Sequence, residues 1–142
     1  MLITTVYRVA AGLLLLGTVG HTFGGLLGTA RGGRSGESGD QVLAQMKSVH
    51  FMWRGTDSTW YNFWMGNGLG VSALLLLAIV VLWTLGGLGA DARRATLPIA
   101  WTALVSLILL TVCGFRYFSP VVGGAFGLVA LLAGIAVVLS TV

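Results

Sequence analysis

The chain has 142 residues, of which 56% are hydrophobic and only 8% are charged, and its formal net charge is +4. Soluble domains carry about 25% charged residues, so this composition excludes an ordinary water-soluble domain. The basic residues are scattered among the ends of apolar blocks of about 20 residues, which predicts an integral membrane protein that contacts membrane lipids and binds no nucleic acid.

The first apolar segment is predicted to be a transmembrane helix over residues 6–30. Arg8 precedes an apolar run, as in a secretory signal peptide, but this run is longer than a usual signal-peptide core of about 7–15 residues. A turn rich in glycine and serine over residues 31–40 then breaks the helix. Residues 40–53 place apolar side chains at helical spacing, which predicts a short amphipathic helix in the membrane interface. An irregular loop is the alternative for that segment.

Three further spans are predicted, over residues 58–88, 96–115 and 120–142. Asp57 or Ser58 can cap the second span, because a side-chain oxygen there accepts hydrogen bonds from free helix amides. Thr96 can cap the third span, and Ser119 followed by Pro120 has the same role before the fourth. The predicted fold is therefore all-α: one domain over residues 1–142, an antiparallel four-helix bundle with up-down-up-down threading and both termini on one side.

Glycine is predicted to pack the helices together. Lipid tails are as apolar as leucine, so helices in a membrane associate through close backbone approach at small residues. A spacing of four residues recurs on the first, second and fourth spans and predicts these packing positions: Gly20, Gly24, Gly28, Gly66, Gly70, Gly123 and Gly127. The repetition predicts a tight bundle, or bundles that form a homodimer or join a larger membrane complex.

Most polar and aromatic side chains are predicted to lie at one end of the bundle. Up-down threading brings the long connection to the same membrane face as the end of the first span, the start of the second and the end of the third. The candidate ligand-binding residues at that face are His21, His50, Trp53, Arg54, Trp60, Tyr61, Asn62, Trp64, Asn67, Arg116 and Tyr117. Tryptophan and tyrosine also favour headgroup depth, so an aromatic belt is the alternative for Trp53, Trp60, Tyr61 and Trp64.

Several polar groups of this end have both a structural and a functional interpretation. An ionisable group inside a membrane is a candidate for function, whereas a neutral His21 bonded to a backbone carbonyl or to Asn67 would be structural. Asn62 and Asn67 require a hydrogen bond to a neighbouring helix, or a wet cavity. Arg54 and Asp57 are close enough in the sequence to pair and to close the turn before the second span.

No cofactor, metal site or catalytic residue is predicted. His21 and His50 lack a paired HxxxH spacing, and the single Cys113 excludes a disulfide within the chain and a cysteine-based metal motif. The sequence also lacks HExxH, GxSxG, CxxC and P-loop motifs, and it has no carboxylate in the middle of a span. A haem or a quinone stays open as an alternative, and so does the question whether the protein is an enzyme.

The first span, YRVAAGLLLLGTVGHTFGG with Arg8, Gly12, Gly17, Gly20 and His21, resembles the opening helix of DoxX-like small four-helix bacterial membrane proteins. The stretch KSVHFMWRGTDSTWYNFWMGNGLG is similar to uncharacterised bacterial four-span proteins with an aromatic entry to the second span. The resemblance covers about half of the chain and implies four helices in the cytoplasmic (inner) membrane. The long amphipathic connection departs from the DoxX-like pattern, so no redox-partner role is carried over.

The sequence thus predicts a small integral membrane protein that binds a lipid, a quinone or a partner subunit at the polar and aromatic end of its bundle. The alternative is a membrane-bound oxidoreductase or other enzyme acting on an amphiphilic substrate, with His21, Arg54 and Asn67 converging on that substrate. The count of basic residues alone favours a cytoplasmic long connection. The family resemblance instead implies cytoplasmic termini, and this is the orientation predicted.

Overall fold

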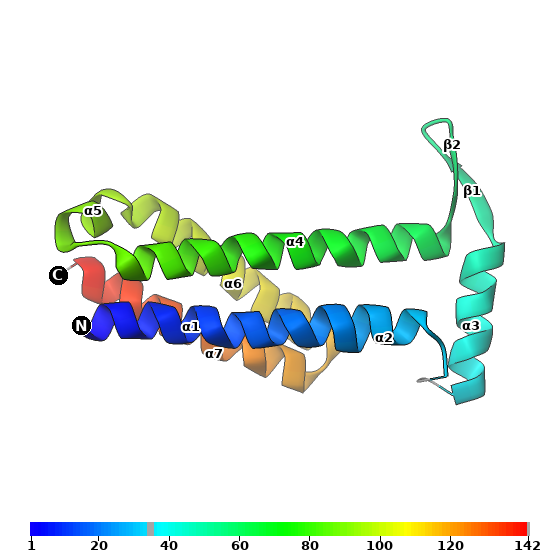
Figure 1. The fold of residues 1–142 in the computed structure, drawn as a ribbon, viewed down its shortest axis with the longest axis horizontal. Helices are drawn as coiled ribbons and strands as arrows, with labels where there is room; N and C mark the ends of the chain where they lie inside the picture. Colours follow the sequence, from blue (N-terminus) through cyan, green and yellow to red (C-terminus); the bar gives the residue numbers. More distant parts are fainter. Residues whose placement is uncertain (34–35, 142) are drawn as a thin grey trace. The chain divides into compact units, whose positions relative to one another are not determined.

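A computed structural model describes residues 1–33 and 36–141, which are mostly helical (Figure 1). The elements in chain order are α1 Leu2–Val19, the π-helical η1 Gly20–Leu26, α2 Leu27–Ala30, α3 Gly36–Ser48, β1 His50–Trp53, β2 Thr56–Thr59, α4 Trp60–Gly87, α5 Ala90–Ala95, α6 Leu97–Cys113, the π-helical η2 Gly114–Phe118 and α7 Pro120–Thr141. Their contacts form two compact units. We call Met1–Gly17 with Leu75–Val142 the terminal unit, and Thr18–Leu74 the hairpin unit. The single domain over residues 1–142 stays a prediction from the sequence.

Four helices of the described residues are long and apolar enough to cross a membrane. They cover Leu2–Ala30, Trp60–Gly87, Leu97–Phe118 and Pro120–Thr141, with 29, 28, 22 and 22 residues. A helix rises 1.5 Å per residue, so each exceeds the roughly 20 residues that a hydrocarbon layer of ~30 Å requires. The protein is therefore a multi-pass membrane protein, as its composition predicts. The third of these helices extends past the predicted end at residue 115 because η2 continues it to Phe118.

The connection between the first two spans differs from the sequence prediction. Helix α3 ends at Ser48, and His50–Trp53, predicted to end the amphipathic helix, forms a strand that pairs antiparallel with Thr56–Thr59. Two residues make the turn, with φ of 49° at Arg54 and 83° at Gly55. Positive φ at both central positions is the backbone of a type I′ turn, whose twist matches that of the flanking strands. The aromatic residues of β1 favour a strand for the same segment.

Helices α6 and α7 form a packed pair within the terminal unit. A Cβ on Gly134 would lie 3.6 Å from Leu104, and a Cβ on Gly127 would lie 3.4 Å from Thr111. As the chain advances along α6, its contacts therefore move back along α7, so the two helices run in opposite directions. Leu107 and Val137 are almost fully buried between helices of this unit, together with the small residues Ala133 and Ala136. Small side chains on the inner face of α7 allow this close approach.

The backbones of η2 and the start of α7 approach each other closely. A Cβ on Gly114 would lie 2.8 Å from the Cα and 2.9 Å from the N of Gly123, and a Cβ on Gly123 would collide with the ring of Phe115. Only glycine at both positions fits this distance. Gly123 and Gly127 thus lie in the contact with the neighbouring helix, as expected of packing glycines, and Gly114 is a third position that the spacing of four residues did not mark.

Three of the other predicted packing glycines do not share this property. Gly20, Gly66 and Gly70 have no heavy atom within 4 Å of the place where a Cβ would lie, and Gly24 and Gly28 are half-buried. The helix contact in the hairpin unit uses Gly68 instead, where a Cβ would collide with the side chain of Leu26. Gly66 and Gly70 are each two residues from Gly68, which is about 200° around an α-helix, so they face away from this contact.

The capping hydrogen bonds follow the sequence prediction in one case out of three. Ser119 Oγ accepts a hydrogen bond of 3.3 Å from the backbone N–H three residues further on, as predicted for the cap of α7. Helix α4 is capped by Thr59, whose Oγ1 accepts a 3.1 Å hydrogen bond from the third residue of the helix, and not by Asp57 or Ser58. Thr96 occupies the N-cap position of α6 as predicted, but its hydroxyl donates to carbonyls of α5 and makes no capping hydrogen bond.

Candidate ligand-binding site

The hairpin and the start of α4 gather four aromatic side chains into one cluster, which we call the aromatic cluster. The ring of Phe51 lies 4.8 Å from that of Trp60 and 6.3 Å from that of Phe63, and the rings of Trp53 and Phe63 are 6.5 Å apart. Phe51 and Trp53 alternate along β1 and therefore share one face of the hairpin. Trp53, Trp60 and Phe63 are 59%, 50% and 52% exposed. A cluster of exposed aromatic side chains is typical of an interface with lipid or with a ligand.

A second aromatic pair ties α3 to α4. The rings of Tyr61 and Trp64 lie 5.9 Å apart, and the Lys47 ammonium lies 4.9 Å from the centre of the Tyr61 ring. A cation over an aromatic face contributes about 0.5–1 kcal/mol at a partly exposed position. Tyr61 and Trp64 are half-buried, unlike Trp60, so the predicted belt residues divide into an exposed and a partly covered group.

Asp57 pairs with His50, and not with Arg54 as predicted. The Nδ1 atom of His50 lies 2.9 Å from a carboxylate oxygen of Asp57, and both side chains are exposed. His50 is opposite Thr59 in the ladder, so Asp57, two residues earlier in β2, is its diagonal neighbour on the same face. Arg54 lies in the turn instead, at the end of the strands remote from α4 (Figure 1). An exposed pair of this kind contributes at most about 1 kcal/mol to stability.

His21 is bonded to a backbone carbonyl, one of the two partners predicted for it. Its Nε2 lies 3.3 Å from the carbonyl oxygen of Gly68, so Nε2 carries the proton that is donated. Ser72 donates to the same oxygen at 3.0 Å, and its Oγ lies 2.9 Å from the hydroxyl of Thr22. The result is a polar chain across the contact between the first and second spans. Hydrogen bonds of this kind join helices in a membrane.

The π-helical segment η1 explains why this contact is formed. His21 and Leu26 both meet α4 at Gly68, although they are five residues apart. In an α-helix five residues turn the chain to a position about 140° away, whereas the i→i+5 bonds of a π-helix bring such residues onto one side. Sequence periodicity alone does not reveal this change, and it also did not mark Thr22 and Ser72, which the structure adds to the contact.

The two asparagines do not form the predicted links between helices. Asn62 and Asn67 are exposed, and within residues 1–33 and 36–141 neither amide makes a side-chain hydrogen bond to a neighbouring helix. Asn62 lies on the face of Gly66 and Gly70, which is turned away from the contact at Gly68. The predicted convergence of His21, Arg54 and Asn67 is likewise absent from the described residues. Arg54 lies in the turn of the hairpin, whereas His21 of η1 is bonded to the carbonyl of Gly68 in α4.

Arg116 and Tyr117 belong to the terminal unit, where the Arg116 guanidinium lies 5.5 Å from the centre of the Tyr117 ring. The candidate site is therefore confined to the hairpin unit: the aromatic cluster, with His50, Asp57 and Lys47 beside it. Within the part of the chain that the structure describes, no three His, Cys, Asp or Glu side chains lie close enough to hold a metal ion.

Comparison of the chain with protein-family models, with curated proteins and with solved structures finds no match. The resemblance to DoxX-like proteins stays a prediction from the sequence.

Proposed function

We propose that the protein is a four-span antiparallel bundle of the inner membrane that binds the headgroup region of an amphiphile, a lipid or a quinone, at its hairpin unit. The observation that carries this proposal is the exposed aromatic cluster at the point where a membrane span begins. Trp60 is both the first residue of α4 and a member of the cluster. Because α4 carries no charged residue from there on, we place the cluster at headgroup depth, where tryptophan is favoured.

The polar groups beside the cluster supply the means to select a headgroup. Lys47 and His50 can donate hydrogen bonds to a phosphate or a quinone carbonyl, and the carboxylate of Asp57 orients the ring of His50. Helix α3, with Leu43 buried and charged residues near both of its ends, lies in the interface plane in this arrangement. The termini lie in the cytoplasm, as the family resemblance implies.

The proposal is tested by the intrinsic fluorescence of tryptophan in the full chain. A short-chain benzoquinone quenches nearby tryptophans, and lipids brominated close to the headgroup report contact with the interface. We expect saturable quenching by one of these two probes, and a loss of affinity of about tenfold or more when Trp53 and Trp60 are both replaced by Ala. Trp101→Ala removes an exposed tryptophan of α6 in the terminal unit and serves as the matched control. Equal affinity for the double variant and the control would refute the proposal.

A further inference from the structure

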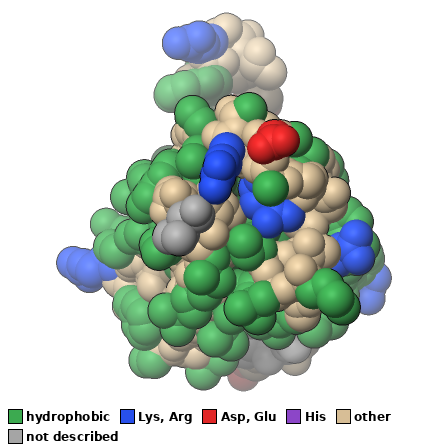
Figure 2. Space-filling view, turned by 90° about the vertical axis from the view of Figure 1, so that its left-hand side faces the viewer, with side chains coloured by type: hydrophobic (Ala, Val, Ile, Leu, Met, Phe, Trp, Pro, Cys, Tyr) green, Lys and Arg blue, Asp and Glu red, His purple; other side chains and the backbone are tan. Residues whose placement is uncertain are grey.

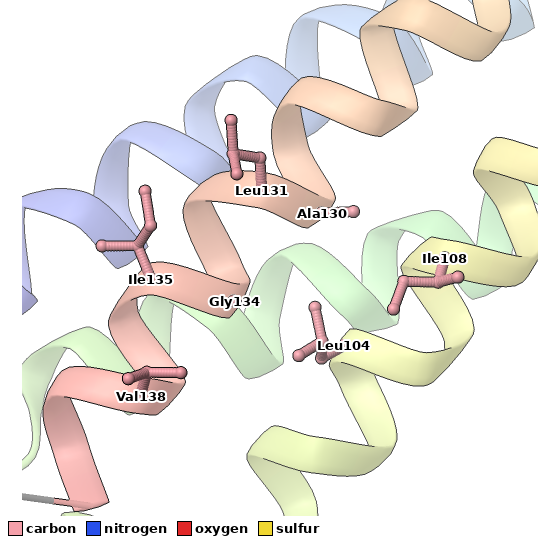
Figure 3. A pocket seen from close by; sticks show the side chains of 7 residues that line it. All are labelled: Leu104, Ile108, Ala130, Leu131, Gly134, Ile135 and Val138. Carbon is pink, nitrogen blue, oxygen red and sulfur yellow. The ribbon is translucent and has the colours of Figure 1, made fainter.

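The contact between α6 and α7 determines which side of α6 faces outward. Leu104 and Thr111 lie against Gly134 and Gly127 of α7, and Leu104 also lines an apolar groove between the two helices (Figure 3). Each residue turns an α-helix by about 100°, so positions 102, 106, 109 and 113 lie on the side opposite to Leu104 and Thr111. The side chains at these four positions are all exposed.

This outward side of α6 is polar, although a membrane span usually presents apolar side chains to lipid. Thr102, Ser106, Leu109 and Cys113 form it, and we call these four residues the outer row. Helix α6 contains four serine, threonine and cysteine residues, and all of them except Thr111 belong to the outer row. Lipid tails form no hydrogen bonds, whereas serine and threonine are enriched where membrane helices meet. The outer row therefore has the composition of a contact between helices.

The outer row passes through the middle of the membrane. Helix α5, which precedes α6, carries Asp91, Arg93 and Arg94, and Figure 2 looks onto this charged end of the terminal unit. These charges place the start of α6 at a water surface. The third span has 22 residues, Leu97–Phe118, so its midpoint lies between residues 107 and 108. Ser106 is then about 2 Å from the midplane of the membrane, where no water is available to its hydroxyl.

The hydroxyls of the outer row can bind a second copy of the same surface. The Thr102 hydroxyl donates to the carbonyl oxygen of Pro98 at 2.9 Å, and the Ser106 hydroxyl donates to that of Thr102 at 2.9 Å. Both bonds use the hydroxyl hydrogen and leave the lone pairs of the oxygen able to accept. A hydroxyl can also rotate and donate elsewhere, so a row of hydroxyls is complementary to itself. A symmetric dimer requires this property, because the same surface meets itself across the axis.

The spacing of the outer row suits a pair of parallel helices. Its four residues are separated by four, three and four positions. Alternating separations of four and three keep one row in contact along two helices that cross at about +20°, the commonest packing of membrane helices. The regular α-helical spacing ends with Cys113, because the π-helical segment η2 begins at Gly114.

We propose that α6 pairs with α6 of a second copy of this chain along the outer row, in a symmetric dimer whose axis is perpendicular to the membrane. Both copies then have the same orientation, so Thr102, Ser106 and Cys113 each face their counterpart in the second copy. One Ser106 hydroxyl donates to the other near the midplane. This surface is independent of the aromatic cluster in the hairpin unit, so either proposal can fail alone.

The test uses Cys113, the single cysteine of the chain, and needs no substitution. The full chain in membrane vesicles is oxidised with copper phenanthroline, and non-reducing gel electrophoresis measures the disulfide-linked dimer. Two cysteines form a disulfide when their Cα atoms are about 4.4–6.8 Å apart, a distance that facing residues of two packed helices reach. We expect most of the chain to be linked, with a yield that does not fall when the vesicles are fused with excess lipid.

A matched control moves the thiol by one residue. Val112→Cys combined with Cys113→Ser places the thiol at nearly the same depth and at an exposed position, but about 100° away around α6. We expect its yield of linked dimer to be about fivefold lower or less than that. Ser106→Cys combined with Cys113→Ser returns the thiol to the outer row and should link as well as the unaltered chain. Circular dichroism shows whether each variant folds.

A second measurement removes the hydroxyls and keeps the size of the side chains nearly constant. Thr102→Val combined with Ser106→Ala should weaken the dimer about three- to tenfold in sedimentation equilibrium in mild detergent. Thr84→Val, which removes an exposed hydroxyl from α4 in the same unit, should leave the affinity unchanged.

Four results would overturn the proposal. Without a linked dimer at Cys113, or with equal linking at positions 112 and 113, the outer row would not be the contact between copies. A yield that falls with added lipid would show random encounters. Linking of Cys113 to a different protein would assign the outer row to another partner. Equal weakening by Thr84→Val would mean that the hydroxyls of the outer row have no special part in the dimer.

Discussion

The close approach of Gly114 and Gly123 gives a sharp prediction for the substitution Gly114→Ala. The added Cβ would lie 2.8 Å from the Cα of Gly123 and 3.3 Å from the carbonyl carbon of Val122. Carbon atoms in contact are about 3.5–4.0 Å apart, so the start of α7 must move by roughly 1 Å. The obstacle is backbone and cannot rotate aside. Overpacking of this kind costs about 1–3 kcal/mol, and we expect Gly114→Ala to lower the free energy of unfolding by that amount.

The matched control is Gly124→Ala, one residue from Gly123 on the same helix. A Cβ at Gly124 meets no heavy atom within 4 Å, and alanine favours helix over glycine by up to about 1 kcal/mol. Unfolding of both variants by SDS in mixed micelles, followed by circular dichroism, compares the two free energies. The control should equal or exceed the unaltered protein. If Gly114→Ala proved as stable as Gly124→Ala, the two backbones would not lie at the distance described.

Three further predictions use the same assays or simple chemical labelling. Gly68→Leu should destabilise the protein by about 1–3 kcal/mol because the new side chain meets Leu26. Gly66→Leu, on the opposite face of α4, should change stability by less than about 0.5 kcal/mol. If Gly66→Leu were the more destabilising of the two, the face of α4 that contacts the first span would be the one with Gly66. Cys113, exposed but within the third span, should react slowly with a water-soluble maleimide in open membranes, while a cysteine introduced at Ala92 reacts fast, since only thiolate in water is reactive. Asp57→Asn should cost less than about 1 kcal/mol in thermal unfolding, and high salt should reduce the difference; a larger loss would mean that the hairpin depends on this pair.

The four membrane helices could be predicted from the sequence because length and apolarity determine them almost alone. The hairpin could not. HFMW is too short for a period of 3.6 residues to be distinguished from a period of 2. Its turn, Arg54–Gly55, is also less distinctive than Asn-Gly or Asp-Gly. The glycine spacing had a similar weakness, since pairs four residues apart occur by chance in a chain with 22 glycines. The contact between Gly68 and Leu26 determines which face of α4 packs against the first span, and the spacing of the glycines does not.

The sequence prediction contained two of the four aromatic side chains of the cluster, Trp53 and Trp60, and missed Phe51 and Phe63. Trp53 and Trp60 stand out in any sequence this apolar, and both belong to the cluster. Asp57 was assigned to Arg54 because the two are close in the sequence, but the ladder register makes His50 its neighbour. The turn fixes the register of the two strands, so side-chain pairs across the hairpin cannot be predicted unless the hairpin itself is predicted.

Ser119 is the single residue between η2 and α7. One residue advances the chain by about 3.8 Å, a small fraction of the ~30 Å thickness of the hydrocarbon layer. The end of the third span and the start of the fourth must therefore lie at one membrane surface. A change of flanking charge that reversed the membrane orientation of one of these helices would therefore have to reverse the orientation of the other. During biosynthesis we expect the two helices to be inserted into the membrane as a pair.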